Sequence, residues 1–510
     1  MLPMFLFKPL DDILNKITMY RLVLYFLIFL WICGLIFSFL NLLSFSYLEL
    51  LISTSIIILT SFITNKVFAR LFNTFTNLES VYISSLILIL IITPARTIQE
   101  YIFIIFASIF AMASKYILNI NKKHIFNPVA VSVLVAFLFS IGGASWWVGT
   151  SAMLIPVLFG LLIVRKIQRF SLFFSFLITA ISVLILFSFI SSFDTFLILK
   201  NTLFESPLLF FALIMLTEPL TTPPTKNLQI YYGIIVGILF YPQIHISTFY
   251  LTPEAALISG NIFSYLVSPK EKLILFLKEK IRLTHDTYDF VFNLNKNFSF
   301  IPGQYLEWTL GFKNPDSRGN RRYFTISSSP TEKDLRIGVK FYENSSSFKK
   351  NLLSLNMGDR IIAGNLAGDF VLPKDENKKL VFILGGIGIT PFRSIVKYLL
   401  DNNKKIPAVV FYSNKEKSDI VYKDLLEKAK EKLNIKTIYN LTDLENIPKD
   451  WEGESGRINK DLIKKYVPDY KERIFYLSGP HSMVSGFEEV LFEMGVNPTN
   501  IKKDFFPGYV

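Results

Sequence analysis

The chain has 510 residues, of which 51% are apolar and only 18% are charged, and 50 of them are phenylalanine. Together with a mean hydropathy of +0.42, this composition excludes disordered, collagenous and disulfide-rich chains and predicts a protein that is wholly or half embedded in a membrane. The net charge of +13 comes from basic residues that membrane topology explains, so we expect a lipid environment and no nucleic-acid partner.

Charged residues are distributed unevenly along the chain. Residues 1–268 contain 14 of the 53 Lys and Arg residues and 9 of the 40 Asp and Glu residues, whereas the remainder has the charge content of a soluble protein. We therefore predict a membrane half and a soluble half that join near Pro269. The single cysteine, Cys33, excludes an intrachain disulfide and an iron–sulfur cluster held by this chain alone.

The first half contains ten apolar stretches that predict ten membrane spans, several of them shorter than the usual ~20 residues. Twelve basic residues fall in the amino terminus and the even-numbered connections, and only Arg96 and Lys200 fall in the odd-numbered ones. This asymmetry predicts a multi-pass protein of the cell membrane with both termini and the soluble half in the cytoplasm. It disfavours the alternative that these helices form the core of a soluble protein and that the charges between them are distributed at random. The stretches cover about residues 20–42, 48–64, 81–93, 99–118, 129–142, 146–164, 170–190, 203–217, 229–243 and 251–267.

The segment LTEPLTTPPTKNLQIYYGIIVG (216–237) places an acid, three prolines and four threonines at the end of a span. Proline interrupts helical hydrogen bonding, and broken backbone is stable at membrane depth only where it lines a cavity or a bound polar group. The alternative is an ordinary cytoplasmic loop punctuated by proline. We predict an electron-carrier or ion site formed by Glu218, Thr221, Thr222 and Thr225.

Three motifs in this half, FNPVAVSVLV (126–135), WWVGTSAMLIPVLFGLLIVRKI (146–167) and TEPLTTPPTK, resemble RnfD, a membrane protein of Rnf electron-transport complexes, and NqrB, its relative in the sodium-pumping NADH:quinone oxidoreductase. The resemblance covers about residues 110–268 and implies a ten-helix bundle that carries flavin. Those proteins attach a flavin phosphate to the Thr of a Ser-Gly-Ala-Thr motif, where this chain has Gly142, Gly143, Ala144 and Ser145. The expected second flavin is therefore non-covalent.

From Leu273 onward the sequence changes to short strands with alternating apolar residues, which predict a small antiparallel β-barrel. After Pro373, apolar strands alternate with helical segments, which predicts a doubly wound parallel sheet. The expected domains are thus a polytopic α-helical membrane domain (1–268), a β-barrel domain (269–374) and an α/β domain (375–510).

Two motifs of the soluble half carry chemistry. GGIGITP (385–391) follows a buried strand and opens a helix, so its glycines allow the backbone to approach a pyrophosphate. RRYFTISSS (321–329) fits the Arg-x-(Tyr/Phe)-(Ser/Thr) pattern of the ferredoxin-NADP reductase superfamily, which residues 273–510 resemble. IPGQY (301–305), GDFVLP (368–373) and SGPHSM (478–483) accompany these motifs in the order typical of that superfamily.

The resemblance implies non-covalent FAD in the barrel domain and NADH or NADPH in the α/β domain, where Lys415 and Lys417 leave the choice of nucleotide open. In the superfamily, the Arg neutralises the flavin pyrophosphate, the aromatic residue packs on the flavin ring and the hydroxyl contacts the ring near its hydride-accepting atom. The implied cofactor-binding residues are Arg322, Tyr323, Phe324, Thr325, Ser346, Ser347, Phe348, Lys349, Gly385, Gly386, Gly388, Thr390, Pro391, Gly479, Pro480 and Met483.

The resemblance also implies the catalytic residues Thr325, Ser478 and Phe506. Ser478 stands where the superfamily usually has Cys, so no thiol is expected to act in hydride transfer. The tail DFFPGYV offers Phe506 as an aromatic cover for the flavin ring, although a packed hydrophobic tail is an equal alternative. His285 and His481 are expected to be surface or hydrogen-bonding residues, and we expect no metal site.

The expected function is an FAD-dependent NAD(P)H oxidoreductase that passes electrons into or across the membrane to a quinone, an extracytoplasmic flavoprotein or another acceptor. One alternative is a transmembrane ferric reductase or oxidase that carries haem. Two bis-histidine haems would need four membrane histidines, whereas this half has only His124 and His245. A reduced-minus-oxidised visible spectrum separates these enzymes. A second alternative is a transporter with a nucleotide-sensing domain, which would bind FAD without turning over NAD(P)H.

Overall fold

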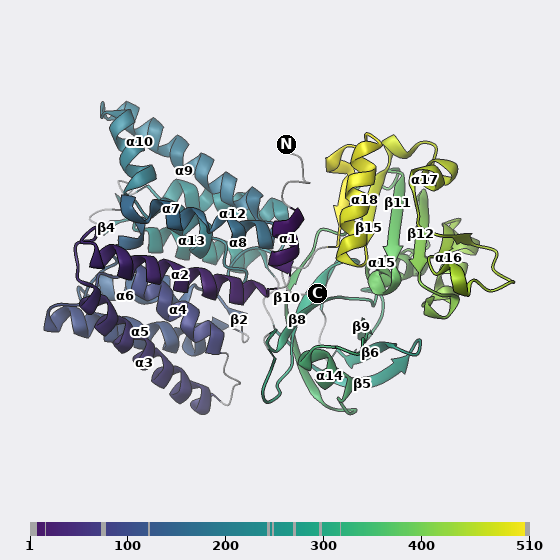
Figure 1. Ribbon diagram of the computed structural model, residues 1–510, viewed down its shortest axis with the longest axis horizontal. Coiled ribbons are helices and arrows are strands. Elements are labelled where there is room, and N and C mark those ends of the chain that lie inside the picture. Colours follow the sequence, from purple (N-terminus) through teal and green to yellow (C-terminus); the bar gives the residue numbers. More distant parts are fainter. Residues whose placement is uncertain are drawn as a thin grey trace. The chain divides into compact units, whose positions relative to one another are not determined.

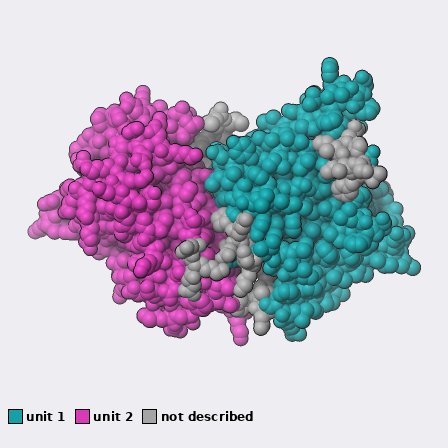
Figure 2. Space-filling view, turned by 180° about the vertical axis from the view of Figure 1, so that it is seen from behind, with its two compact units in different colours: residues 1–272, 507–510 teal, residues 273–506 magenta. Residues whose placement is uncertain are grey.

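The computed structural model divides the chain into two compact units, residues 1–272 and residues 273–506 (Figure 2). The division lies next to the boundary predicted from the change in charge density. The structure describes residues 8–15, 17–72, 78–120, 123–241, 245–246, 249–268, 272–294, 298–316 and 318–504.

The first unit is almost entirely helical (Figure 1). Its longer helices are α1 (Lys8–Asn15), α2 (Met19–Phe39), α3 (Tyr47–Leu71), α4 (Leu78–Ile91), α5 (Ile98–Ile117), α6 (Pro128–Leu138), α9 (Phe170–Ile190), α10 (Thr195–Phe204), α12 (Lys226–Leu239) and α13 (Pro253–Val267). Its shorter elements are η2 (Trp147–Gly149), η3 (Ser151–Met153), α7 (Leu154–Leu158), α8 (Leu161–Ile167), α11 (Leu208–Phe210), the π-helical η4 (Phe211–Met215), and the strands β1 (Asn119–Ile120), β2 (Lys123–His124), β3 (His245–Ile246) and β4 (Phe249–Tyr250).

Within the described part of the chain, the four helices α2, α3, α5 and α9 are long and apolar enough to cross a membrane. A fifth span is possible if Thr195–Phe204 and Leu208–Met215, which meet at a bend of 56°, act together. The region predicted as one span over residues 146–164 instead folds as four short helical pieces, in a stretch that contains Pro156 and Gly160. Membrane-spanning helices are therefore present, and the count of ten remains a prediction.

Glycine allows α12 to pack very closely against α9 and α13. A Cβ atom on Gly233 would lie 2.2 Å from Ser175 Oγ, and one on Gly237 would lie 2.9 Å from the Phe176 carbonyl oxygen, both on α9. A Cβ on Gly260 of α13 would lie 2.4 Å from a methyl carbon of Val236. Such small-residue contacts let helix backbones approach in a membrane bundle, and they hold the segment after the proline-rich loop against two neighbours.

The second unit begins with a six-stranded antiparallel sheet whose strand order is β8-β7-β10-β5-β6-β9. Its inward-facing residues form one apolar core that includes the fully buried Trp308, Phe290 and Phe292. The elements are β5 (Leu273–Arg282), β6 (Thr287–Asn293), β7 (Tyr305–Thr309), β8 (Arg321–Thr325), β9 (Leu335–Lys340), β10 (Arg360–Ala367) and the helix α14 (Ser347–Leu353). We call this part the barrel lobe.

A parallel six-stranded sheet with strand order β14-β13-β12-β11-β15-β16 follows and forms the α/β lobe. Strand β11 is apolar throughout because helices cover both of its faces: Phe382 packs with α15 and α16, and Ile383 packs with α17 and α18. The elements are β11 (Leu380–Gly385), η5 (Gly386–Ile389), α15 (Thr390–Asp401), β12 (Ala408–Asn414), η6 (Lys417–Asp419), α16 (Lys423–Leu433), β13 (Lys436–Leu441), η7 (Leu444–Asn446), β14 (Glu454–Ser455), α17 (Lys460–Tyr466), η8 (Tyr470–Glu472), β15 (Ile474–Ser478), α18 (His481–Glu493), η9 (Pro498–Asn500) and β16 (Ile501–Lys503).

Candidate functional site

A cluster of basic and aromatic side chains lies where β8 meets α14 in the barrel lobe. The guanidinium of Arg322 stacks over the Phe348 ring at 5.5 Å, and the Phe324 and Phe348 rings lie 6.0 Å apart. Burial and the neighbouring charges of Arg322 and Arg318 lower the pKa of Lys349 to about 8. An anionic ligand placed here would relieve this repulsion, so the cluster suits a pyrophosphate group.

Asp316 supplies the balancing negative charge of this cluster. Its carboxylate accepts hydrogen bonds from Arg318 and from the Ser347 backbone N–H, with an N–O distance of 2.8 Å to each. The hydrogen bond from Ser347 and those from Arg318 lower the pKa of Asp316 to about 2, against the opposing effect of burial. With Asp316 ionised, Arg318, Arg322, Lys349 and Asp316 together carry a net charge of +2, which is the charge that complements a pyrophosphate.

Not every residue predicted from the β8 motif lies on the same face. Tyr323 points to the opposite face of β8 from Arg322 and Phe324, because side chains alternate along a strand. Its ring packs edge-on against Tyr305 at 5.6 Å, and its hydroxyl lies 3.5 Å from Glu307. Ser346 caps α14 by accepting a hydrogen bond from the Lys349 backbone N–H. The roles of these residues toward a flavin remain predictions.

The two glycine motifs of the α/β lobe are in direct contact at the carboxyl ends of β11 and β15. A Cβ atom on Gly388 would lie 2.5 Å from the Gly479 backbone nitrogen, and one on Gly385 would lie 2.5 Å from Met483 Sδ. Gly386 differs from both, since its φ is +51° and a Cβ there would meet nothing within 4 Å. Gly385 and Gly388 are therefore needed for close packing, whereas Gly386 leaves open space over the turn. Thr390 and Pro391 begin α15 directly after it.

A carboxyl group joins the two lobes at the predicted catalytic residues. Asp504, which follows β16, accepts hydrogen bonds on one oxygen from Thr325 Oγ1 at 3.0 Å and from Ser478 Oγ at 3.3 Å. Burial raises the pKa of Asp504 to about 7, and these two hydrogen bonds oppose the rise. At neutral pH this carboxyl can therefore hold or release a proton between the barrel strand and the end of β15. Phe506, the third predicted catalytic residue, lies outside the described residues.

The raised pKa of Asp504 predicts a pH-dependent stability of the soluble half. Because the folded-state pKa of about 7 exceeds the ordinary 3.8, the folded protein binds more protons than the unfolded chain between these values. The free energy of unfolding should then fall by up to about 4 kcal/mol as pH rises from about 4 to about 7. When residues 273–510 are unfolded with urea, the free energy of unfolding should depend less on pH in Asp504→Asn than in wild type. An equal pH dependence in both would contradict the raised pKa of Asp504.

The first turn of α15 is bonded directly to the loop that follows the flavin-motif strand β8. Arg393 donates to the Ser327 carbonyl oxygen at 2.9 Å and pairs with Glu332, while Ser394 Oγ donates to the Ser328 carbonyl oxygen at 2.6 Å. All but Glu332 are buried. These contacts fix the glycine turn of the α/β lobe relative to Thr325 of the barrel lobe.

The predicted membrane site forms part of a polar network in which Glu218 is half-buried and its partners are buried. Glu218 accepts hydrogen bonds from Asn127 Nδ2 at 2.9 Å and from Thr221 Oγ1 at 3.2 Å. The Asn127 backbone N–H donates to Asn261 Oδ1 at 2.9 Å, and Asn261 Nδ2 donates to the Tyr232 hydroxyl at 3.0 Å. The network thus ties the proline-rich loop to the start of α6 and to α12 and α13. Asn127, Asn261 and Tyr232 were not expected, because their contacts join residues far apart in sequence.

The other two predicted threonines have different hydrogen-bond partners from Thr221. Thr222 contacts the guanidinium of Arg169, which also lies 3.4 Å from the Thr217 carbonyl oxygen. Thr225 precedes α12 without a side-chain capping bond. Another acid, the buried Glu254 at the start of α13, accepts a hydrogen bond from Trp146 Nε1 at 2.9 Å.

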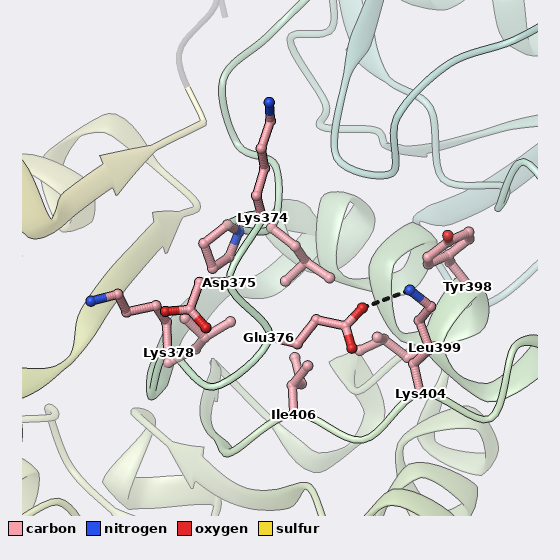
Figure 3. Close-up of a pocket in the computed structure, with 11 residues that line it drawn as sticks. Lys374, Asp375, Glu376, Lys378, Tyr398, Leu399, Lys404 and Ile406 are labelled. Carbon is pink, nitrogen blue, oxygen red and sulfur yellow. Dashed lines mark hydrogen bonds and ion pairs between the residues drawn. The ribbon is translucent and has the colours of Figure 1, made fainter.

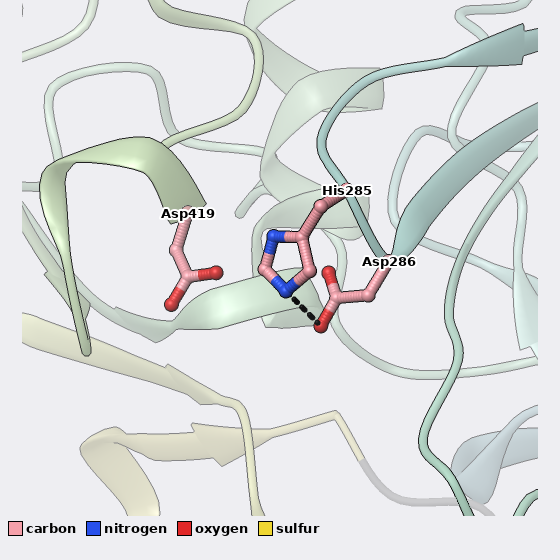
Figure 4. Close-up of side chains that lie close together, drawn as sticks. All are labelled: His285, Asp286 and Asp419. Atoms are coloured by element: carbon pink, nitrogen blue, oxygen red, sulfur yellow. Dashed lines mark ion pairs between the residues drawn. The ribbon is translucent and has the colours of Figure 1, made fainter.

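Two further features lie apart from these residues. A cavity of about 280 Å³ lies between residues 372–380 and the end of α15, with Lys404 and Glu376 paired at its wall (Figure 3). His285, Asp286 and Asp419 lie close together (Figure 4). Lys340 Nζ lies 3.2 Å from Asp286 and 3.1 Å from Asp419, so this cluster is an ion-pair network between the lobes.

Comparison with protein families separates the two halves. Residues 111–264 match the model of the NQR2, RnfD, RnfE family, and residues 382–489 match the oxidoreductase NAD-binding domain. These matches confirm both predicted resemblances, and the oxidoreductase NAD-binding match in the soluble half is that of an enzyme, as predicted.

Among curated relatives, Flavohemoprotein A of Dictyostelium discoideum is 26% identical over 221 residues, which are 41% of this chain and 53% of that protein. NADH-cytochrome b5 reductase 1 of Aspergillus terreus is 27% identical over 241 residues, 45% of this chain and 80% of that protein. A solved flavohemoglobin from Malassezia yamatoensis is 22% identical, covers 59% of this chain and 73% of its own, and has a TM-score of 0.43. The chain spans about half to three fifths of the length of the first curated relatives.

Proposed function

We propose that this protein is a membrane-bound flavin oxidoreductase that takes electrons from a nicotinamide nucleotide and passes them into its membrane half. The observation that carries the proposal is the meeting of Thr325, Ser478 and Asp504 at the junction of the lobes, beside the glycine turn. Hydride donor and acceptor must meet at such a junction. The name of one curated relative, NADH-cytochrome b5 reductase 1, supports the same chemistry.

The residues present fit FAD in the barrel lobe. Arg322, Arg318 and Lys349 provide the surplus positive charge that a pyrophosphate requires, and Phe324 provides an apolar surface beside it. FAD would supply a group that accepts two electrons as hydride and releases them singly. Thr325 and Asp504 would then orient the reacting edge of the bound ring and hold a proton near it. The glycine turn at residues 385–388 would bind the nucleotide phosphates through its backbone.

In the membrane half, we propose that the network around Glu218 is the electron-carrier or ion site. A half-buried acid bonded to Asn127 and Thr221 beside a π-helical turn is a costly arrangement in a membrane, and such groups mark functional pathways. The hydrocarbon core is about 30 Å thick, so electrons that cross it need a carrier between its faces. A non-covalent flavin is the carrier that suits this family domain, with a quinone or an extracytoplasmic flavoprotein as acceptor. We place the soluble half in the cytoplasm, where nicotinamide nucleotides are available.

Glu218→Gln tests whether the membrane half carries out a step of electron transfer that is separate from nucleotide oxidation in the soluble half. The variant should keep NADH-driven reduction of a soluble dye while losing most of its reduction of a membrane quinone, because it replaces the carboxyl group of the membrane network and leaves the soluble half unchanged. Both rates are measured on the full chain in native membranes. Glu205→Gln, which changes an exposed acid after α10, is the matched control and should leave both rates unchanged. Equal quinone reduction by Glu218→Gln and wild type would contradict the role of Glu218.

A further inference from the structure

One acid of the barrel lobe faces away from the barrel core and is nevertheless buried. Phe290 and Phe292 of β6 belong to that core, so strand alternation places Asp289 on the opposite face of the sheet. Asp289 is only 2% exposed, and acids are almost never fully buried without a partner. The α/β lobe supplies the partner, because the Tyr422 hydroxyl donates to Asp289 Oδ1 at 2.6 Å.

Gly338 provides the space for this hydrogen bond. It lies directly opposite Asp289 where β9 pairs with β6, so the two positions share one face of the sheet. A Cβ atom on Gly338 would lie 2.8 Å from the Tyr422 hydroxyl oxygen, 2.8 Å from Thr390 Cγ2 and 3.2 Å from Ile387 Cδ1. The glycine turn and the start of α15 therefore pack directly against β9, next to the point where Tyr422 bonds to Asp289.

The backbone of Tyr422 has an uncommon conformation. Its φ is +56°, in the left-handed region, directly before α16. A bulky residue rarely adopts this conformation, which persists only where the surrounding structure fixes it. The Arg393 guanidinium lies over the Tyr422 ring at 5.8 Å. Burial raises the pKa of Tyr422, and the neighbouring Asp289 raises it further. The hydroxyl is therefore protonated at neutral pH and can donate.

Tyr422 attaches the α/β lobe to the barrel lobe at a second place. Arg393 and Ser394 bond to carbonyl oxygens of the loop after β8, whereas Tyr422 bonds to strand β6. A single attachment would allow one lobe to rotate relative to the other, and a second attachment prevents this rotation. A flavin bound to the barrel lobe and a nucleotide bound to the glycine turn would then be held at a fixed separation.

We propose that Tyr422 is a positioning residue for hydride transfer, an inference that rests on the proposed function. Its hydrogen bond to Asp289 holds the glycine turn against β9 and so sets the distance between the bound nicotinamide and the flavin ring. Hydride transfer is sensitive to this distance, since a displacement of about 1 Å can cost about 100-fold in rate. Tyr422 acts through the placement of the turn and forms no part of the proposed cofactor sites.

The first test is anaerobic stopped-flow reduction of the flavin by NADH in the purified full chain. Tyr422→Phe removes only the hydroxyl and should lower the limiting rate at saturating NADH by about tenfold, with unchanged flavin content and apparent Kd for NADH. Asp289→Asn keeps an oxygen acceptor and should retain most of the rate, whereas Asp289→Leu should match Tyr422→Phe. Tyr439→Phe is the matched control, because the Tyr439 hydroxyl donates to Glu427 at 2.9 Å within the α/β lobe. It should leave the limiting rate unchanged.

The second test measures the placement of the lobes without turnover. Spin labels are attached to Lys350→Cys on α14 and Lys428→Cys on α16, both exposed positions, after the single native cysteine is removed by Cys33→Ser. The distribution of distances between the labels should broaden in Tyr422→Phe and should stay as narrow as in wild type in Tyr439→Phe.

The outcomes separate this inference from the proposed function. Wild-type flavin that NADH does not reduce would overturn the function itself. If NADH reduces wild type and Tyr422→Phe at the same limiting rate, or if Tyr439→Phe is slowed equally, the positioning role alone is overturned. A slower Tyr422→Phe variant that has lost flavin or binds NADH more weakly would also overturn it, and so would a label distribution that this variant leaves unchanged.

Discussion

Gly386→Val is expected to slow NADH-driven reduction of the flavin by about 100-fold, which corresponds to about 2.7 kcal/mol in the barrier. Gly386 has a φ of +51°, and a Cβ there meets no protein atom within 4 Å. A branched side chain would enter the open space over the turn that the nucleotide phosphates need, and it would strain the backbone. Stopped-flow bleaching of the flavin band by NADH measures the effect, while reduction by dithionite should be unchanged.

The control for backbone strain is Gly495→Val. Gly495 follows α18 with a φ of +79°, and its Cβ would meet no atom closer than 3.8 Å. The substitution therefore introduces a comparable left-handed strain in the same lobe, away from the glycine turn. If Gly495→Val slows NADH-driven reduction as much as Gly386→Val does, or if Gly386→Val slows dithionite reduction equally, the turn has a structural role only.

Truncation of the chain to residues 273–510 is expected to have the second large effect, on the rate of quinone reduction in membranes. Residues 273–510 contain all of the proposed FAD and nucleotide residues and build their own apolar cores. This fragment should therefore reduce a soluble dye with NADH at close to the rate of the full chain. Its reduction of quinone in membranes should fall by at least about 100-fold, because the bilayer core is about 30 Å thick and the fragment has no carrier within it.

The comparison is made at equal flavin concentration, with the full chain and the fragment added to the same quinone-containing membranes. Dye reduction by the same samples controls for damage to the reductase module. If the fragment reduces membrane quinone as fast as the full chain does, the helical half is an anchor and has no part in electron transfer.

The soluble half could be predicted largely from sequence because its chemistry sits in local motifs. Strand β11, the glycine turn and the start of α15 are consecutive in the chain, so apolar runs and small residues predict them together. Asp504 was missed because it reaches Thr325 only through the pairing of β16 with β15. The sequence offered one signal for Asp504, namely that this acid directly precedes the aromatic C-terminal segment. The opposite orientation of Tyr323 follows from strand alternation and could have been predicted.

The membrane half was harder to predict for physical reasons. Apolar composition predicts that a segment prefers lipid, but it does not show where a helix breaks, and residues 146–167 break in a stretch that contains Gly149, Pro156 and Gly160. Glu218 was found because an acid among prolines is unusual in such a segment. Its partner Asn127 and the neighbouring Asn261 lie on segments that only the tertiary structure brings together.

The most direct test of the central claim is an anaerobic titration of the purified full chain with NADH, followed in the visible spectrum. The account predicts that acid precipitation releases FAD in an amount at least equimolar with the protein, that NADH bleaches the flavin band, and that added quinone restores it. A protein that contains no FAD, or whose flavin band NADH leaves unchanged while dithionite bleaches it, would contradict the account.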